Sequence, residues 1–320
     1  MMYIHFIGGL IVLLVGGELL VRGAVALAQR LAVNPLLIGL TVVAVGTSAP
    51  ELVVSIDASL RNATALAIGN IMGSNVANIV LVLGLPALLR PISCNTRSVG
   101  LDNTVMIIST LIFILFCLGN EIGHWQGIVL VSSLVAYIFW RYWSNRGDIE
   151  QNKHYSNEVT GIVQNQWSFW RSTIFVLAGL VGLTVGAELL IGGAVDIARV
   201  MGISEAIIGL TLVAIGTSLP ELVAVTVSVL RGHSDLAIGN VIGSNMFNIM
   251  GVIGTTAIIV PLPVPPELLQ VDLWIMLVTT LLLTPILIRR MPINAPIGVG
   301  FLLIYAGFIM AQFYVGHSAG

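Results

Sequence analysis

The chain has 320 residues, of which 57% are hydrophobic and 9% are charged, and its formal net charge is -2. Ordinary soluble domains carry about 25% charged residues, so this composition excludes a water-soluble globule and indicates an integral membrane protein with lipid-facing helices. The long apolar runs also exclude a membrane β-barrel, whose segments would be about ten residues long with alternating polarity.

Redox and nucleic-acid functions find no support in the composition. The two cysteines, Cys94 and Cys117, are too far apart for a CxxC site, and the five histidines show no metal-ligand spacing. The small net charge does not indicate a nucleic-acid partner. We therefore expect no cofactor, no enzymatic centre and no obligatory protein partner.

The apolar runs predict an all-α fold with ten transmembrane helices of about 20 residues each. No Lys or Arg precedes the first run, so we expect it to remain as a span and not to be cleaved as a signal peptide. The polar stretch Ser144 to Ser168 predicts a linker, which divides the chain into repeats at 1–143 and 171–320 with a cytoplasmic linker at 144–170. The helices are expected near 5–29, 36–60, 66–89, 102–119, 124–143, 172–198, 206–230, 236–260, 271–288 and 295–315.

Basic residues predict the orientation, because Lys and Arg concentrate in cytoplasmic loops. With an external amino terminus, the outward connections hold only Arg61 and Arg199, and Arg22 lies inside the first helix. Both termini are therefore predicted on the extracytoplasmic side of the cell (inner) membrane. The inward connections hold the other ten basic residues: Arg30, Arg90, Arg97, Arg141, Arg146, Lys153, Arg171, Arg231, Arg289 and Arg290.

The chain contains a duplication. Residues 38–52 (IGLTVVAVGTSAPEL) match residues 208–222 (IGLTLVAIGTSLPEL) at 12 of 15 positions, with an offset of 170. The same offset aligns LAIGNIMGSNVANI (66–79) with LAIGNVIGSNMFNI (236–249) at 10 of 14 positions. Each half holds an odd number of spans, so the second copy is predicted to be inverted. Inverted repeats with interrupted helices are typical of secondary transporters that work by alternating access.

The first repeated motif combines a helix break with oxygen side chains. Thr47, Ser48 and Glu51 share one helix face, and Pro50 between them lacks an N–H and opens the helix at that turn. A carbonyl freed in this way is tolerated in a membrane where it lines a polar cavity or binds an ion. Thr217, Ser218, Pro220 and Glu221 repeat the pattern.

The second motif is predicted to face the first. Ser74 and Asn78 lie one helical turn apart, as do Ser244 and Asn248. Glu51 with Ser74 and Thr47 with Asn78 are equidistant from the short turn after Arg61, so each pair should lie at equal depth. The distance from that turn to Glu51 is roughly 17 Å, near the middle of a hydrocarbon layer about 30 Å thick.

The two mid-membrane glutamates, Glu51 and Glu221, lack any Lys or Arg at their level. A carboxylate at that depth costs on the order of 2.5 to 3.5 kcal/mol on insertion scales, which makes it a functional residue by default. The counter-charge is then a bound cation or a proton. Carboxylate, hydroxyl, amide and carbonyl oxygens suit a hard cation such as calcium or sodium.

At GTSAPEL with GSNVANI, and again at GTSLPEL with GSNMFNI, the sequence resembles the calcium/cation antiporter superfamily, which includes the prokaryotic sodium/calcium exchangers. The resemblance implies ten helices in two inverted five-helix repeats, four clustered ion sites at the centre, and helices one and six that slide past the core. It places the calcium carboxylates on Glu51 and Glu221. The hydroxyl ligands fall on Thr47, Ser48, Ser74, Thr217, Ser218 and Ser244, the amides on Asn78 and Asn248, and the broken-helix carbonyls on Ala44 and Ala214.

Two departures from the family pattern matter. Well-studied exchangers resemble this chain except that an Asp occupies the position of Asn248, which puts the sodium stoichiometry and any potassium dependence in question. The linker, at about 25 residues, is too short for a calcium-sensing domain, so we expect no built-in sensor.

The leading hypothesis is an antiporter that exchanges Ca2+ for Na+. A Ca2+/H+ (or other divalent cation/H+) antiporter could use the same glutamates, whereas a passive channel would not need inverted halves and an intramembrane hydrolase would need a water-activating pair. For individual residues, the alternatives are hydroxyls bonded back to helix carbonyls and interhelical amide bonds. Asn75 and Asn245 are expected to fasten the broken helices.

Four other acidic residues are assigned structural interpretations. Glu18 and its repeat mate Glu188 are expected to be packing or interfacial carboxylates, with a gating role as the alternative. Asp102 and Asp272 are expected to cap the starts of two spans.

Overall fold

The computed structural model describes residues 2–93, 96, 98–145, 167–201 and 216–318, and these segments are mostly helical. The first half comprises α1 (Met2–Leu31), α2 (Pro35–Ile38), the π-helical segment η1 (Gly39–Val43), α3 (Ala44–Thr47), α4 (Ala49–Leu60), α5 (Thr64–Val80), α6 (Gly84–Leu89), α7 (Val99–Cys117), β1 (Glu121–Ile122) and α8 (His124–Asn145). The second half comprises α10 (Phe169–Val200), α13 (Leu219–Leu230), α14 (Ser234–Met246), the π-helical segment η3 (Phe247–Ile253), α15 (Gly254–Ile259), β2 (Leu262–Pro263), α16 (Pro266–Gln270), α17 (Asp272–Ile288) and α18 (Ala295–Ser318).

Each predicted range contains helix where the chain is described, although 36–60, 66–89 and 236–260 are each divided into shorter helical segments. Seven described helices are long and apolar enough to cross a membrane, or eight if the bent pair Pro35–Thr47 and Ala49–Leu60 is one span. Leu219–Leu230 and Asp272–Ile288 are shorter apolar helices. The start of the predicted span 206–230, together with residues 146–166 of the predicted linker, lies outside the described residues.

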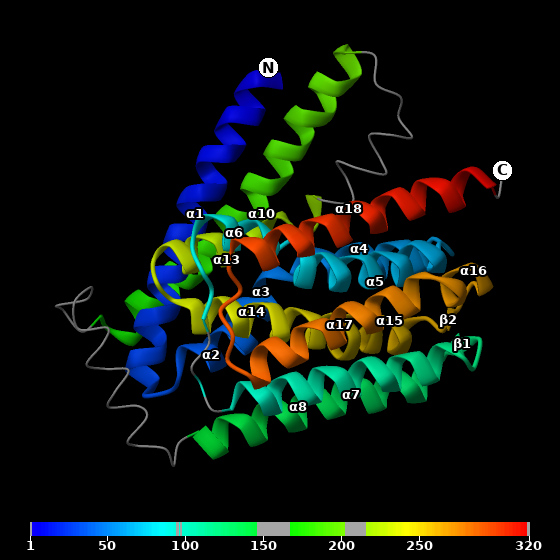
Figure 1. The fold of residues 1–320 in the computed structure, drawn as a ribbon, viewed down its shortest axis with the longest axis horizontal. Helices are drawn as coiled ribbons and strands as arrows, with labels where there is room; N and C mark the ends of the chain where they lie inside the picture. The colour runs from blue at the N-terminus through cyan, green and yellow to red at the C-terminus, as the bar shows by residue number, and fades with distance from the viewer. Residues whose placement is uncertain (1, 94–95, 97, 146–166, 202–215, 319–320) are drawn as a thin grey trace.

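The helices α1 and α10 lie side by side and cross the other helices steeply (Figure 1). Glycines allow their backbones to touch: a Cβ on Gly179 would stand 2.4 Å from the Leu20 nitrogen, and one on Gly186 would stand 2.5 Å from the Leu13 nitrogen. Small residues promote membrane helix association in this way because they let two backbones approach closely. The pair therefore forms a tight unit beside the remaining helices.

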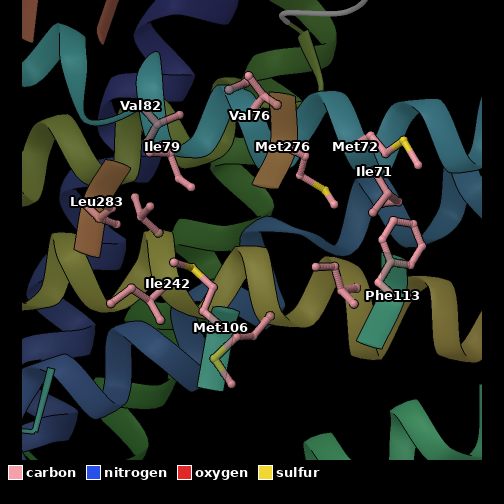
Figure 2. Close-up of a cluster of buried hydrophobic side chains, with 14 of the residues drawn as sticks. Ile71, Met72, Val76, Ile79, Val82, Met106, Phe113, Ile242, Met276 and Leu283 are labelled. Atoms are coloured by element: carbon pink, nitrogen blue, oxygen red, sulfur yellow. The ribbon is translucent and has the colours of Figure 1, made fainter. Parts of the chain in front are cut away.

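The second packing unit is an apolar core formed in large part by α5, α7 and α17. Figure 2 shows side chains of three helices in this core. α5 contributes Ile71, Met72, Val76 and Ile79, and Val82 follows just after its end; α7 contributes Met106 and Phe113, and α17 contributes Met276 and Leu283. These side chains are fully or almost fully buried. They fix α5 against α7 and α17, which holds the inner face of α5 in place.

Backbone contact also fixes α14. A Cβ on Gly239 would stand 2.2 Å from the carbonyl oxygen of Leu36, and a Cβ on Gly243 would stand 2.3 Å from that of Leu40. Because α14 touches α2 and η1 without intervening side chains, the polar face of α14 lies directly beside the first broken helix.

The expectation that Asp102 caps a span is wrong. Ser98 precedes α7, and the buried Asp102 carboxylate pairs instead with Arg141 of α8, with an Nε–Oδ1 distance of 2.6 Å, and accepts a hydrogen bond from Tyr137. Arg141, counted as a loop residue when orientation was predicted, is buried within α8. Counting basic residues by their position in the sequence cannot recognise a buried ion pair, because it ignores the acidic partner. Asp272 does begin α17, but it accepts a hydrogen bond from Gln312.

Candidate cation site

Both copies of the first motif interrupt a helix at the serine. α3 ends at Thr47, Ser48 has φ -88° and ψ 10°, and α4 begins at Ala49; the two sides are bent by 42°. Ser218 adopts nearly the same conformation, with φ -88° and ψ 2°, before α13. In each copy a proline stands in the first turn of the new helix, where its missing N–H is tolerated. The break is therefore encoded locally and occurs twice.

The new helices carry the two glutamates into the interior. Glu51 is 0% exposed and Glu221 is 1% exposed. Ser48 connects the two motifs, because its hydroxyl donates to Glu221 Oε1 at 3.0 Å. The ion pairs of the described residues include neither glutamate.

Several buried oxygens of the repeated motifs have no hydrogen-bond partner among the described residues. Buried polar groups are normally satisfied, so a cluster of unsatisfied acceptors indicates an absent ligand. Acceptors that face one another can all be satisfied by a cation. The set comprises both carboxylate oxygens of Glu51, Oε2 of Glu221, the hydroxyls of Thr217 and Ser218, and the amide oxygens of Asn78 and Asn248.

Four asparagines form a reciprocal network between α5 and the α14–η3 segment. Asn78 Nδ2 donates to Asn245 Oδ1, and Asn248 Nδ2 donates to Asn75 Oδ1, both at 3.1 Å. Asn75 Nδ2 donates to the Asn245 carbonyl at 3.4 Å, and Asn245 Nδ2 donates to the Asn75 carbonyl at 3.3 Å. Asn75 and Asn245 thus fasten the two motifs together, as expected. Because the amide nitrogens of Asn78 and Asn248 are engaged, their oxygens are left free.

The remaining predicted hydroxyls lie at the same centre. Ser74 lies beside the Glu51 carboxyl group. Thr47 Oγ1 is 3.4 Å from both the Ala44 carbonyl oxygen and Asn240 Oδ1, and the hydroxyl of Ser244 also approaches Asn240 Oδ1 at 3.4 Å. Predicted side-chain ligands from both repeats are therefore brought together.

Of the two predicted carbonyl ligands, the structure describes only that of Ala44. The Ala44 carbonyl accepts from the Ser48 amide at 3.0 Å and lies within reach of the Thr47 hydroxyl, so its oxygen is already engaged in this structure. Ala214 lies outside the described residues.

Asn240 was missed by the sequence reasoning. It is 2% exposed and contacts two predicted ligands, Thr47 and Ser244. The available signal was its position one helical turn before Ser244 on the same face, repeated at Asn70 before Ser74.

The donor set is that of a hard cation. Within the described residues no three His, Cys, Asp or Glu side chains come together in a way that could hold a metal ion, and the charged donors here are two carboxylates. Neutral amide and hydroxyl oxygens supply the rest, as calcium and sodium prefer. The π-helical segments η1 and η3 border the motifs, and such bulges occur frequently at functional sites.

Comparison with known proteins places this geometry in context. Residues 1–143 and 171–314 match the family described as sodium/calcium exchanger protein. A putative antiporter CaxA of Alkalimonas amylolytica is 37% identical over 278 residues, with 86% of each chain covered. The sodium/calcium exchanger MaX1 of Methanosarcina acetivorans is 30% identical, covering 96% of this chain and 97% of its own. The solved structure of the sodium-calcium exchanger NCX_Mj matches with a TM-score of 0.82 at 32% identity, covering 96% of this chain and 97% of the other.

Proposed function

The chain belongs to the sodium/calcium exchanger protein family, and we propose that it is a secondary active antiporter that exchanges Ca2+ for Na+ across the membrane by alternating access. It is a multi-pass integral membrane protein with a fold that matches the solved structure of NCX_Mj. The observation that carries the proposal is the set of buried oxygens on the two repeated motifs, those of Glu51 and Glu221 included, that have no hydrogen-bond partner in the described part of the chain. Such a cluster is stable only when a cation or protons occupy it.

We assign the ions to the predicted ligands. Glu51 and Glu221 supply the negative charge for Ca2+, and the amide oxygens of Asn78 and Asn248 complete a central shell of neutral donors. The peripheral hydroxyls and the broken-helix carbonyls hold Na+, since they carry no formal charge. These ligands are Thr47, Ser48, Ser74, Thr217, Ser218 and Ser244, with the carbonyls of Ala44 and Ala214.

Charge balance couples the two ions. Two carboxylates are neutralised by one Ca2+ or by two Na+, so either cargo removes the net charge of the site. An empty site with two negative charges is expensive to move through an apolar barrier, so the conformational change is favoured only when ions are bound. This coupling is what exchange requires.

The wider architecture follows the same logic. We propose ten spans in two inverted five-helix repeats, at residues 1–143 and 171–320, joined by a cytoplasmic linker at 144–170. Both termini lie outside the cell (inner) membrane. The support for this arrangement is the duplication at an offset of 170 and the bias of basic residues toward one set of connections. No cofactor and no protein partner is required by this scheme.

Flux in sealed proteoliposomes tests the proposal. We expect an outward Na+ gradient to drive Ca2+ uptake, and a proton gradient of equal size to fail. Glu51→Gln should abolish uptake, while Glu121→Gln, which removes an exposed carboxylate far along the chain, should leave it unchanged. If only the proton gradient drives uptake, the counter-ion is H+; if neither does, or Glu51→Gln transports normally, the assignment is wrong.

A further inference from the structure

The helices that carry the two glutamates differ on one buried face. One and two turns after Glu51, α4 presents Ser55 and Ser59, which are 0% and 1% exposed. At the repeat-related positions after Glu221, α13 presents Val225 and Val229, which are equally buried. Residues four apart lie on the same face of a helix. The face of α4 leading from Glu51 to the α4–α5 turn is therefore polar, and the corresponding face of α13 is apolar.

Ser55 is unusual among the buried serines of these helices. The hydroxyl of Ser59 donates to the Ser55 carbonyl at 2.7 Å, and that of Ser228 donates to the Ala224 carbonyl at 2.7 Å. Within the described residues Ser55 Oγ has no partner. Leaving a buried hydroxyl unsatisfied costs roughly 1–3 kcal/mol, so a ligand at this position would recover that free energy.

Asn70 lies at the same level on the neighbouring helix. α4 and α5 pack together and are joined by the turn after Arg61; Ser55 and Asn70 are equidistant from its centre. Asn70 also precedes Ser74 by one turn, on the face that approaches Glu51. Its Nδ2 is buried and has no hydrogen-bond partner in the described segments, and rotation of the amide by 180° brings Oδ1 to the same place.

We propose that Ser55, Asn70 and one carboxylate oxygen of Glu51 form a further cation site, one helical turn (about 6 Å) from the central site toward the α4–α5 turn. Neither oxygen of Glu51 has a hydrogen-bond partner among the residues that the structure describes, so one can serve each site. A single shared carboxylate with neutral oxygens suits a monovalent cation, and Na+ is the one that the proposed function supplies. Because Val225 stands at the position that corresponds to Ser55, the second repeat has no counterpart of this site. The site therefore serves ions that arrive from one face of the membrane only.

The inference rests on the proposed Na+/Ca2+ exchange and makes a one-sided prediction. In oriented proteoliposomes, Ser55→Ala should raise the half-saturating Na+ concentration at the face of the α4–α5 turn by about five- to tenfold, the loss of one neutral ligand. The other face should change less than twofold. Ser55→Thr, which keeps the hydroxyl, should restore the wild-type value.

Two matched variants separate binding from packing. Ser228→Ala removes a buried hydroxyl that is already satisfied by a helix carbonyl, so it should shift neither face. Val225→Ser should lower the half-saturating Na+ concentration at the opposite face. Thermal melting of each purified variant identifies any that fails to fold, in which case Ser55→Thr and Val225→Ser carry the comparison.

Different results would overturn the Na+/Ca2+ exchange and the additional cation site. Wild-type vesicles without Na+-driven Ca2+ uptake would overturn the exchange itself. Normal exchange with equal Na+ constants for wild type and Ser55→Ala, or an equal shift at both faces, would overturn only the additional site.

Discussion

Glu18 of α1 is ion-paired with Arg231 at the end of α13, with an Nη2–Oε1 distance of 2.6 Å and an Nε–Oε2 distance of 2.9 Å. The same carboxylate pairs with Arg22, one turn further along α1, at 2.6 Å. Glu18 therefore links the α1–α10 unit to a helix of the candidate site, which is compatible with the expected packing or interfacial carboxylate and with its alternative, a gating role. The repeat mates differ: Glu188 is exposed, and Arg61 pairs with Asp57 at 2.8 Å.

Glu18→Gln should shift the balance between the two access states. The pair ties α1 to α13 in the present conformation, and an ion pair this exposed is worth about 0.2–1 kcal/mol, or up to about a fivefold change in population. We expect the apparent Ca2+ affinity, measured separately at each face, to rise at one and fall at the other. Glu188→Gln is the matched control and should alter neither. A uniform loss of activity in Glu18→Gln would indicate a purely structural carboxylate.

Asn248→Asp should alter ion preference. The change adds a third negative charge beside Glu51 and Glu221 and removes the amide that donates to Asn75 Oδ1. We expect a higher ratio of Ca2+ to Na+ apparent affinity, measured by competition in vesicle uptake. Asn78→Asp places the same charge at the repeat-related position, where the amide donates to Asn245 Oδ1, and should act in the same direction. Unchanged Na+ and K+ dependence would show that position 248 lies outside the ion shell.

Periodicity and repeat spacing predicted most of the candidate site. Equal distances from a tight turn brought Glu51 to the level of Ser74, and the proline in each motif predicted the breaks at Ser48 and Ser218. Such features depend on local chain geometry, which follows from residue spacing and from the position of proline. The reciprocal bonds of Asn75 and Asn245 were anticipated only as fastening, because hydrogen-bond partners depend on how the two halves pack.

The residues that the sequence misassigned or left out are those whose partners are distant in sequence. Asp102 is satisfied by Arg141, 39 positions away, and Asn240 meets Thr47, 193 positions away. Neither pairing leaves a periodic signal, because a single polar residue on a buried face can be a cap, a ligand or one half of an ion pair. Packing decides between these roles.

Arg141→Met should destabilise the protein without changing its ion preference. Asp102 is 0% exposed and would lose its counter-charge, and breaking a buried ion pair costs about 3–5 kcal/mol. A lower thermal midpoint of the detergent-solubilised protein would show the loss. Combining Asp102→Asn with Arg141→Met removes both charges and should recover much of the midpoint; no recovery would contradict the ion-pair interpretation.

Gly243→Ala should disturb transport through packing. A Cβ there would stand 2.3 Å from the Leu40 carbonyl oxygen and 2.6 Å from the Leu40 Cα, and since both are backbone atoms, α14 must move away from η1. That movement displaces Ser244, which follows directly, and Asn240, one turn earlier. We expect a lower thermal midpoint together with weaker Na+-driven Ca2+ uptake. Gly192→Ala is the matched control, because a Cβ there meets no described atom within 4 Å and alanine favours the helix by about 1 kcal/mol. Its midpoint and uptake should therefore equal or exceed those of the wild type, and an equal loss in both variants would contradict the contact between α14 and η1.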